Sequence, residues 1–277
     1  MRFTKMQGAG NDYIYFNCFE ERINNPEELA IKLSDRHFGI GGDGIVLICP
    51  SKVADAKMRM FNADGSEGKM CGNAIRCVGK YLYDNNIVKK DEIDIETLSG
   101  IKKLVMTIEN GTAVAARVDM GKAVLNPAEI PVFLDGENII DRPVEIDGKK
   151  YNITCVSMGN PHCIVFVDDV DIIDLPTIGS RFENNPIFPE RVNTEFVQVI
   201  NDSKLKMRVW ERGSGETLAC GTGACAAVVA AVLCGHCRKK SPVEVSLRGG
   251  KLIIEYTDQS VFMTGEAIKV YTGEIEV

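Results

Sequence analysis

The feature of this sequence that most constrains its fold is a motif that occurs twice, in segments that begin at Asn62 and Glu211 and are therefore 149 residues apart. In both copies, a turn rich in small and polar residues leads into Cys-Gly and then into a largely apolar segment; the two cysteines are Cys71 and Cys220. A loop that runs into an apolar segment in this way is typical of the start of a helix. The repeat therefore predicts that each half of the chain delivers one cysteine to a helix N-terminus.

The same spacing relates other parts of the chain. Gly10-Asn11 falls on Gly159-Asn160, each ahead of an apolar run, and Gly44 falls on Asn193 by position and not by residue type. Two identical dipeptides at one spacing indicate a duplicated domain. We therefore predict an α+β fold with two pseudo-symmetric α/β domains, whose cysteines face each other across one cleft.

The apolar pattern predicts the elements of each half. The segment 221–233 contains Ala, Val and Cys on every face, so as a helix it must be buried all round. We therefore expect each domain to be a curled mixed sheet around a central helix. Turn residues and two prolines between Gly121 and Pro131 place the boundary between domains 1–120 and 121–265. The predicted helices are 25–35, with Asn25 as the cap, 72–84, 175–182 and 221–233; the predicted strands are 2–7, 13–17, 45–49, 57–61, 91–97, 103–109, 113–120, 151–156, 163–167, 194–200 and 204–210, with three or four more at the end.

Composition excludes several classes of protein. The 277 residues carry a net charge of −7, and no basic run is longer than Arg238-Lys239-Lys240, which argues against a nucleic-acid or membrane-surface partner. The N-terminal segment has no apolar signal core, and the longest apolar run, 224–234, is too short to span a bilayer. Ten cysteines in such a chain indicate a reducing compartment. We expect a cytoplasmic protein whose other cysteines mostly pack as small apolar residues.

The helix starts suggest a chemistry for the two motif cysteines. Exposed backbone N–H groups and the helix dipole attract a carboxylate at Gly72-Asn73 and Gly221-Thr222, and the same field favours a lowered pKa for Cys71 and Cys220. Two facing thiols suit the inversion of a carbon that bears an acidic hydrogen. One thiolate removes the proton while the other thiol delivers a proton to the opposite face, so no cofactor is needed.

Polar residues around the duplicated segments point to the kind of substrate. Asparagine in a turn is ordinarily there because its side chain hydrogen-bonds to the backbone of the turn. Together with one carboxylate and one guanidinium, however, the set is typical of a cleft that binds ammonium and carboxylate groups. Its members are Asn11, Asn62, Asn160, Asn193, Glu211 and Arg212.

Other chemistries fit the residues less well. No lysine stands out as a Schiff-base residue for pyridoxal phosphate, and the three histidines lie too far apart in sequence to indicate a metal site. A cysteine hydrolase with His162 as its base leaves the second motif cysteine unexplained. Cys234 and Cys237 resemble a dithiol redox motif, but they close a helix, where the dipole disfavours a thiolate.

The complete set of motifs resembles the diaminopimelate epimerase family. The segment from Asn62 to Arg76 is similar to the family signature N-x-D-G-S followed by C-G-N-A-x-R. Five companion segments agree with it in order and spacing: Gly10-Asn11-Asp12, Met158-Gly159-Asn160-Pro161-His162, Arg191-Val192-Asn193-Thr194, Glu211-Arg212-Gly213 and Ala219-Cys220-Gly221-Thr222-Gly223. The resemblance spans nearly the whole chain.

The resemblance implies a cofactor-independent interconversion of LL- and meso-2,6-diaminopimelate for lysine and peptidoglycan synthesis. It implies Cys71 and Cys220 as the acid/base pair, with Gly72-Asn73 and Gly221-Thr222 holding the reacting carboxylate and the polar set above binding the remaining groups. It also implies a homodimer, no metal, and a C-terminal tail, 266–277, that returns to the first domain. Some members of the family have a glutamine side chain in the cleft where this chain has Gly44. We expect Gly44 to line the pocket, where any contact with substrate comes from its backbone, a water molecule or a neighbour.

Three alternatives stay open at this point. A proline or hydroxyproline racemase resembles Cys-Gly-His where this chain has Cys71-Gly72-Asn73, and it needs no groups for a second amino-acid end. A single-base isomerase of the phenazine pathway lacks the cysteine pair. A redox sensor or binding protein would not need charged and amide groups around the cysteines. The sequence does not settle which cysteine carries the thiolate.

Overall fold

The computed structural model describes residues 1–276, so Val277, the last residue of the predicted tail, lies outside the described residues. The chain divides into two compact units. Unit 1 comprises residues 1–119 and the C-terminal segment from Thr264, and unit 2 comprises residues 120–263. Among the described residues, no helix is both long and apolar enough to cross a membrane.

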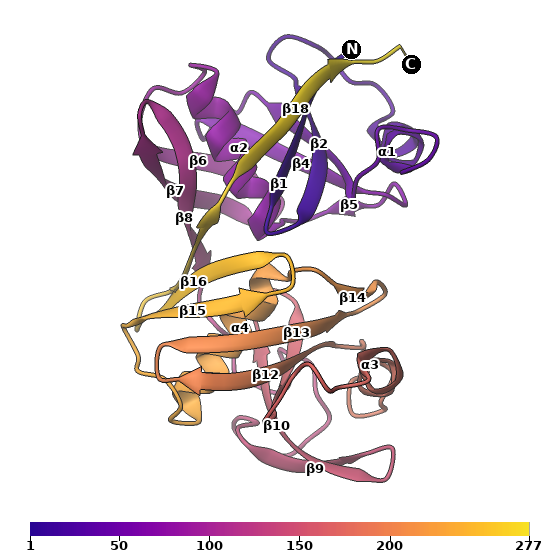
Figure 1. The fold of residues 1–277 in the computed structure, drawn as a ribbon, viewed down its shortest axis with the longest axis vertical. Helices are drawn as coiled ribbons and strands as arrows, with labels where there is room; N and C mark the ends of the chain where they lie inside the picture. Colours follow the sequence, from indigo (N-terminus) through magenta and orange to yellow (C-terminus); the bar gives the residue numbers. More distant parts are fainter. Residues whose placement is uncertain (277) are drawn as a thin grey trace. The chain divides into compact units, whose positions relative to one another are not determined.

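Unit 1 is a mixed sheet with two helices (Figure 1). Its helices are α1 (Pro26–Ser34) and α2 (Gly72–Asp84), and its strands are β1 (Arg2–Gly8), β2 (Asn11–Asn17), β3 (Gly44–Cys49), β4 (Ala56–Asn62), β5 (Glu67–Gly68), β6 (Glu92–Thr97), β7 (Gly100–Glu109), β8 (Thr112–Gly121) and β18 (Ile268–Glu274). The strands pair in the order β18-β1-β2-β3-β4-β6-β7-β8, and β5 also pairs with β4. The β2–β3 and β4–β6 pairs are parallel, while the others are antiparallel.

Unit 2 repeats this arrangement. Its helices are α3 (Leu175–Glu183) and α4 (Gly221–Leu233), and its strands are β9 (Arg142–Ile146), β10 (Lys149–Ser157), β11 (Pro161–Phe166), β12 (Asn193–Asn201), β13 (Lys204–Glu211), β14 (Gly215–Thr217), β15 (Pro242–Leu247) and β16 (Gly250–Tyr256), with β17 (Val261–Glu266) at the boundary. The order is β9-β10-β11-β12-β13-β15-β16, with β14 also on β13. Again two pairs are parallel, β11–β12 and β13–β15.

The strand orders match element by element, with β1 to β7 of unit 1 equivalent to β10 to β16 of unit 2. In both units, a parallel crossover between the second and third strands contains a short helix, and the long helix precedes the sixth strand. The predicted α+β fold with two pseudo-symmetric halves is confirmed. The duplication is therefore one of topology as well as of sequence motifs.

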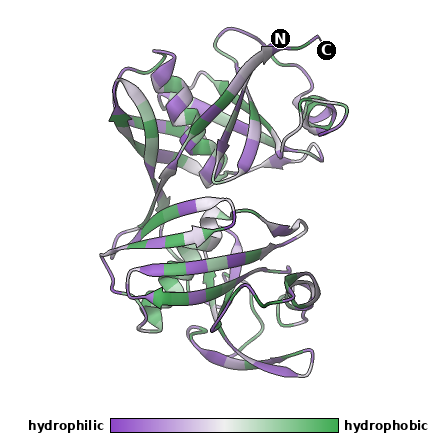
Figure 2. Cartoon of the chain, in the orientation of Figure 1, coloured by the Kyte–Doolittle hydropathy of each residue, from purple (hydrophilic) through white to green (hydrophobic). Residues whose placement is uncertain are grey.

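The long helix of each unit packs against its own sheet. Helix α2 contacts β1, β2 and β7, while α4 contacts β10 to β13, β15 and β16. In α4, all residues from Gly221 to Ala231 except Thr222 are buried, as its lack of a polar face predicts. Figure 2 shows that hydrophobic and hydrophilic residues alternate along many of the strands. Small side chains allow α4 to lie close to the strands around it.

The structure differs from the sequence prediction at the weakest elements. Strands β5, β9 and β14 were not predicted, since β5 and β14 have only 2 and 3 residues and β9 lies in a polar segment. Asn25 precedes α1 as expected, but it adopts a left-handed conformation (φ 51°) and its side chain makes no capping hydrogen bond. The prediction of a side-chain cap at Asn25 is therefore wrong.

Candidate active site

Each motif cysteine is the residue immediately before the long helix of its unit. Cys71 has an extended backbone (φ −132°, ψ 121°), and its Sγ accepts a hydrogen bond from the Ala74 N–H at 3.5 Å. Cys220 has nearly the same backbone (φ −120°, ψ 113°), and its Sγ accepts from the Gly223 N–H at 3.4 Å. The two cysteines therefore occupy equivalent N-cap positions, where the backbone N–H groups can stabilise a thiolate.

A short hydrogen-bond chain orients Cys71 in unit 1. The Cys71 thiol donates to Asn11 Oδ1 at 3.2 Å, while Asn11 Nδ2 donates to Asp43 Oδ2 at 2.6 Å. The carboxylate accepts only, so it fixes which end of the Asn11 amide points toward the sulfur. Because that end is the carbonyl oxygen, the arrangement favours a protonated Cys71 in this conformation.

A cluster of ion pairs holds Asp43, the last residue of this hydrogen-bond chain. Asp12 pairs with Lys5 at 2.6 Å and with Arg36 at 2.7 Å, and Arg36 also pairs with Asp43 at 3.0 Å. Burial raises the pKa of Asp12, but the hydrogen bonds from Arg36 and Lys5 outweigh it and hold the pKa below its usual value. The cluster joins the β1–β2 turn to the glycine-rich loop before β3.

Gly44 and Asn62 lie opposite each other in the β3–β4 ladder. A Cβ atom on Gly44 would lie 2.0 Å from the carbonyl oxygen of Phe61, so no side chain fits at this position. Asn62 Nδ2 donates to Ser66 Oγ at 3.0 Å, within the turn that leads to Cys71. Gly44 can therefore offer only its backbone to a ligand.

The start of α2 is held by a buried arginine. Arg76 is fully buried; its Nη1 donates to the carbonyl of Gly72 at 3.0 Å, and its Nε donates to the carbonyl of Glu266 at 3.2 Å. Asn73 is also buried, and in the described part of the chain its Oδ1 has no hydrogen-bond partner. The Gly72-Asn73 backbone is thus fixed at the helix start by contacts to the C-terminal segment of unit 1.

Cys220 lies in a more acidic environment. Burial, and then the carboxylates of Glu211 and Glu195, raise the pKa of the Cys220 thiol well above its usual value, against smaller effects of Thr222 and the Gly223 N–H. The expectation of a lowered pKa is therefore wrong for Cys220 in this conformation, because desolvation and like charge outweigh the helix terminus. Cys220 carries its proton here.

Glu211 is the carboxylate next to this thiol. Burial raises its pKa, while hydrogen bonds from Thr217 and Cys220 act in the opposite direction. Thr217 Oγ1 donates to Glu211 Oε1 at 2.5 Å. A carboxylate with a raised pKa that contacts a thiol is a suitable acceptor for the thiol proton.

A buried histidine lies on the strand next to this site. His162 Nδ1 is 2.7 Å from Glu195 Oε1, and His162 Nε2 is 3.0 Å from Asn160 Oδ1. Glu195 is fully buried, and a Cβ on Gly223 would lie 2.5 Å from its Oε1. Only glycine fits between this carboxylate and the first turn of α4.

Asn193 and Arg212 are placed by backbone contacts. Asn193 Nδ2 donates to the carbonyl of Pro161 at 2.8 Å, and its Oδ1 accepts from the Arg212 N–H at 3.0 Å. Arg212 Nη1 donates to the carbonyl of Glu190 at 2.8 Å, and its side chain is partly exposed. Asn193 thus connects the starts of β11 and β12 to the end of β13, where Glu211 and Arg212 lie.

The structure brings the predicted residues together within each unit. Asn11, Gly44, Asn62 and Cys71 with its helix start belong to unit 1, and Asn160, Asn193, Glu211, Arg212 and Cys220 with its helix start belong to unit 2. The sequence did not single out three residues that complete these networks: Asp43, Glu195 and Thr217. Of these three, only Glu195 has a signal in the sequence, because it is a lone carboxylate in a buried, largely apolar strand.

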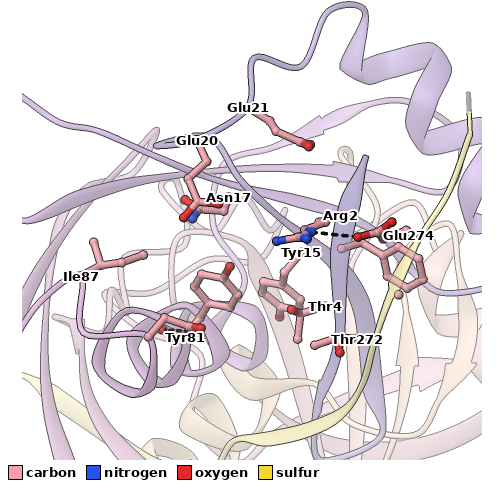
Figure 3. Close-up of a pocket in the computed structure, with 13 residues that line it drawn as sticks. Arg2, Thr4, Tyr15, Asn17, Glu20, Glu21, Tyr81, Ile87, Thr272 and Glu274 are labelled. Carbon is pink, nitrogen blue, oxygen red and sulfur yellow. Dashed lines mark hydrogen bonds and ion pairs between the residues drawn. The ribbon is translucent and has the colours of Figure 1, made fainter.

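Other groups do not form a competing site. Burial is the main cause of a raised pKa at both Cys234 and Cys237, so neither thiol is activated. Within residues 1–276, no three His, Cys, Asp or Glu side chains are grouped to hold a metal ion. A cavity of about 600 Å³ in unit 1 lies between Tyr15, Tyr81 and the Arg2–Glu274 pair, and neither motif cysteine lines it (Figure 3).

Comparison with known sequences identifies one family. The diaminopimelate epimerase family model matches residues 3–126 and 154–270. Diaminopimelate epimerase of Acetivibrio thermocellus is 59% identical, with 100% of this chain and 99% of the relative covered. The enzyme of Desulfovibrio desulfuricans is 57% identical (99% and 98% covered), and that of Methanococcus maripaludis is 54% identical (100% of both).

Solved structures share the fold at low identity. A probable proline racemase from Agrobacterium radiobacter has a TM-score of 0.70 at 14% identity, covering 100% of this chain and 93% of that chain. A phenazine biosynthesis protein of Bacillus anthracis has a TM-score of 0.70 at 16% identity, covering 100% and 99%. At this identity the likeness concerns the fold alone.

Proposed function

The chain belongs to the diaminopimelate epimerase family, and we propose that it interconverts LL- and meso-2,6-diaminopimelate without a cofactor, as an isomerase of lysine and peptidoglycan precursor synthesis. One observation carries the mechanism. Each unit presents a single cysteine at the N-cap of its long helix, at equivalent positions of a duplicated fold. Equivalent positions at two helix starts support an acid/base pair of thiols, one from each unit.

In the proposed reaction, the two thiols act on opposite faces of the substrate carbon. In one direction, the Cys220 proton passes to Glu211, and the resulting thiolate removes the proton from the substrate carbon. The Cys71 thiol, which Asn11 orients in the resting protein, delivers its proton to the other face. In the reverse direction Cys71 is the base and Cys220 the acid.

The negative charge that develops on the substrate carboxylate needs stabilisation. The backbone N–H groups at Gly72-Asn73 and Gly221-Thr222 lie at the N-termini of α2 and α4, where helix dipoles add to their effect. We assign them to the reacting carboxylate.

Both ends of the substrate carry an ammonium and a carboxylate group. We assign their binding to the polar set at the strand ends, in which Arg212 has a guanidinium suited to a carboxylate and Glu211 and the amide oxygens suit an ammonium group. Gly44 contributes backbone only, because no side chain fits there. The set comprises Asn11, Asn62, Asn160, Asn193, Glu211 and Arg212.

We also propose that the protein acts in the cytoplasm as a homodimer. The chain carries ten cysteines, which suits a reducing compartment where thiols stay free. Sedimentation in buffer that contains a reductant tests the second part: a dimer mass at micromolar concentration supports it, and a monomer mass contradicts it.

Conversion of LL-diaminopimelate by the reduced protein tests the reaction itself. The protein is incubated with no added cofactor, L-proline is supplied in a parallel reaction, and the stereoisomers are separated by chiral chromatography. Formation of the meso isomer with proline unchanged supports the proposal. Racemisation of proline alone would move the assignment to the racemases that share the fold.

A further inference from the structure

Two cysteines outside the proposed active site lie side by side in unit 1. Strands β2 and β3 are parallel neighbours, and their register continues from Asn17–Ile48 to Cys18 and Cys49, because the Cys18 N–H donates to the Ile48 carbonyl at 2.9 Å. The two thiols are close enough to shift each other's pKa in opposite directions, and both residues are half-buried. Paired residues on neighbouring strands have Cα atoms about 5 Å apart, within the range that a disulfide bridges.

Basic residues lie next to Cys49. Lys57 is opposite Cys49 in the antiparallel β3–β4 ladder, and Arg59 follows two residues later on the same face of β4. The neighbouring Cys18 thiol, and then the charges of Arg59 and Lys57, lower the pKa of Cys49 despite its burial. The neighbouring Cys49 sulfur, and then burial, raise the pKa of Cys18. Cys49 is therefore the more nucleophilic thiol and Cys18 its protonated neighbour.

Unit 2 contains a matched pair without these features. Cys155 and Cys163 are directly opposite in the β10–β11 ladder, and the Cys155 thiol contributes to the raised pKa of Cys163. Both are fully buried, and burial raises the pKa of Cys163 well above its usual value. The thiols are neighbours in both pairs. Of the two pairs, only Cys18 and Cys49 are partly exposed and lie next to basic residues.

We propose that Cys18 and Cys49 are an oxidant-sensitive dithiol that forms a reversible disulfide with a hydroperoxide as the oxidant. The Cys49 thiolate attacks the peroxide oxygen; the O–O bond breaks, water or an alcohol leaves, and Cys49 becomes a sulfenic acid. The Cys18 thiol then attacks the Cys49 sulfur, and a second water leaves as the S–S bond forms. A dithiol donor reduces the bond and restores both thiols.

Peptide mapping of the intact protein tests this site. Reduced protein is treated with hydrogen peroxide, quenched with N-ethylmaleimide and digested with trypsin, which places Cys18 in peptide 6–22 and Cys49 in peptide 37–52. We expect these peptides to become cross-linked and to separate again with dithiothreitol. Peptide 151–181, which holds Cys155 and Cys163, should stay alkylated at both cysteines.

Variants separate the roles of the two thiols and of the charge. Cys18→Ser should leave Cys49 as a sulfenic acid that dimedone traps. Arg59→Gln should slow cross-linking about threefold to tenfold, since a pKa shift of one unit changes the thiolate fraction about tenfold. Lys251→Gln, which removes an exposed charge from unit 2, should leave the rate unchanged.

The proposal is overturned if Cys18 and Cys49 stay alkylated after oxidation, or if they cross-link no faster than Cys155 and Cys163. Separate over-oxidation of Cys49 with no cross-link also overturns it. Oxidation of Cys71 is scored on peptide 70–76 and that of Cys220 on peptide 213–238, which also holds Cys225, Cys234 and Cys237. Neither peptide contains Cys18 or Cys49, so these outcomes are not obscured.

Discussion

The acid/base role proposed for Cys220 relies on the neighbouring carboxylate of Glu211. Glu211 has a raised pKa because it is buried, and the Cys220 thiol partly offsets this rise. We predict that Glu211→Gln lowers kcat about 100-fold or more, because the amide cannot take up the thiol proton. Steady-state rates with LL-diaminopimelate measure this effect.

The pH dependence of the same variant distinguishes proton transfer from lost structure. A raised pKa means that Glu211 is protonated, and unable to accept a proton, up to a higher pH than an ordinary carboxyl group. The wild-type rate should therefore fall on the acid side, and Glu211→Gln should lose that fall. An unchanged acid limb, or equal loss of rate in the surface control Glu244→Gln, would contradict the role given to Glu211.

Steric crowding by neighbouring atoms requires a glycine at position 44. A Cβ there meets the Phe61 carbonyl oxygen at 2.0 Å and a Tyr13 ring carbon at 2.8 Å. We predict that Gly44→Ala lowers the free energy of unfolding by about 3 kcal/mol, since the β3–β4 ladder must shift. Urea unfolding followed by circular dichroism measures the loss.

Gly100 provides a matched control for this substitution. It also has a positive φ (90°), but a Cβ there meets no atom within 4 Å. Gly100→Ala should cost about 1 kcal/mol from backbone conformation alone. Equal losses at the two positions would show that crowding does not explain Gly44.

At the scale of elements, the Asp12 cluster joins a turn, a helix end and a strand start. Asp12 accepts from Lys5 and Arg36, and the side chains of Asp12 and Lys5 are only 17% and 8% exposed. We predict that Asp12→Asn lowers the free energy of unfolding at pH 7 by about 2 kcal/mol, because Lys5 loses its carboxylate and Arg36 keeps only Asp43. Urea unfolding again gives the value.

The sign of the pH effect follows from the lowered pKa of Asp12. The stabilisation is present above the pKa of the unfolded state, near 4, and is lost as the pH falls through the lower folded value. The difference between wild type and Asp12→Asn should therefore shrink below about pH 4. Asp171→Asn, which removes an exposed pair with Lys206, should change little at any pH. A difference for Asp12→Asn that persists undiminished into acid would refute the charge explanation.

Sequence patterns predicted the strong elements well. Helices α2 and α4 begin and end at the predicted residues because a capped apolar segment has a clear signal at both ends. The strand β14 has too few residues to show an alternating pattern. The expected lowering of the Cys220 pKa was wrong because the carboxylates near the thiol come from other strands. Glu195 and Glu211 approach the thiol through strand pairing, which local sequence does not reveal.

At the scale of the whole molecule, the duplication explains most of the organisation. Equivalent strand orders place Cys71 and Cys220 at equivalent helix starts, and Gly44 and Asn193 at equivalent strand starts. The two sites have diverged in their surroundings: an amide faces the first thiol and a carboxylate the second. Such a difference suits two thiols with opposite protonation states during one reaction.

The most direct test of the two-thiol account is deuterium incorporation in D₂O. LL-diaminopimelate is converted to low extent, and the hydrogen at each α-carbon of substrate and product is followed by NMR and mass spectrometry. The account predicts meso product with deuterium at the inverted carbon and recovered substrate that keeps its hydrogen, because one thiol removes the proton and the other delivers deuterium. Product that retains the substrate hydrogen, or a Cys71→Ala or Cys220→Ala variant that still forms the meso isomer at the wild-type rate, would contradict it.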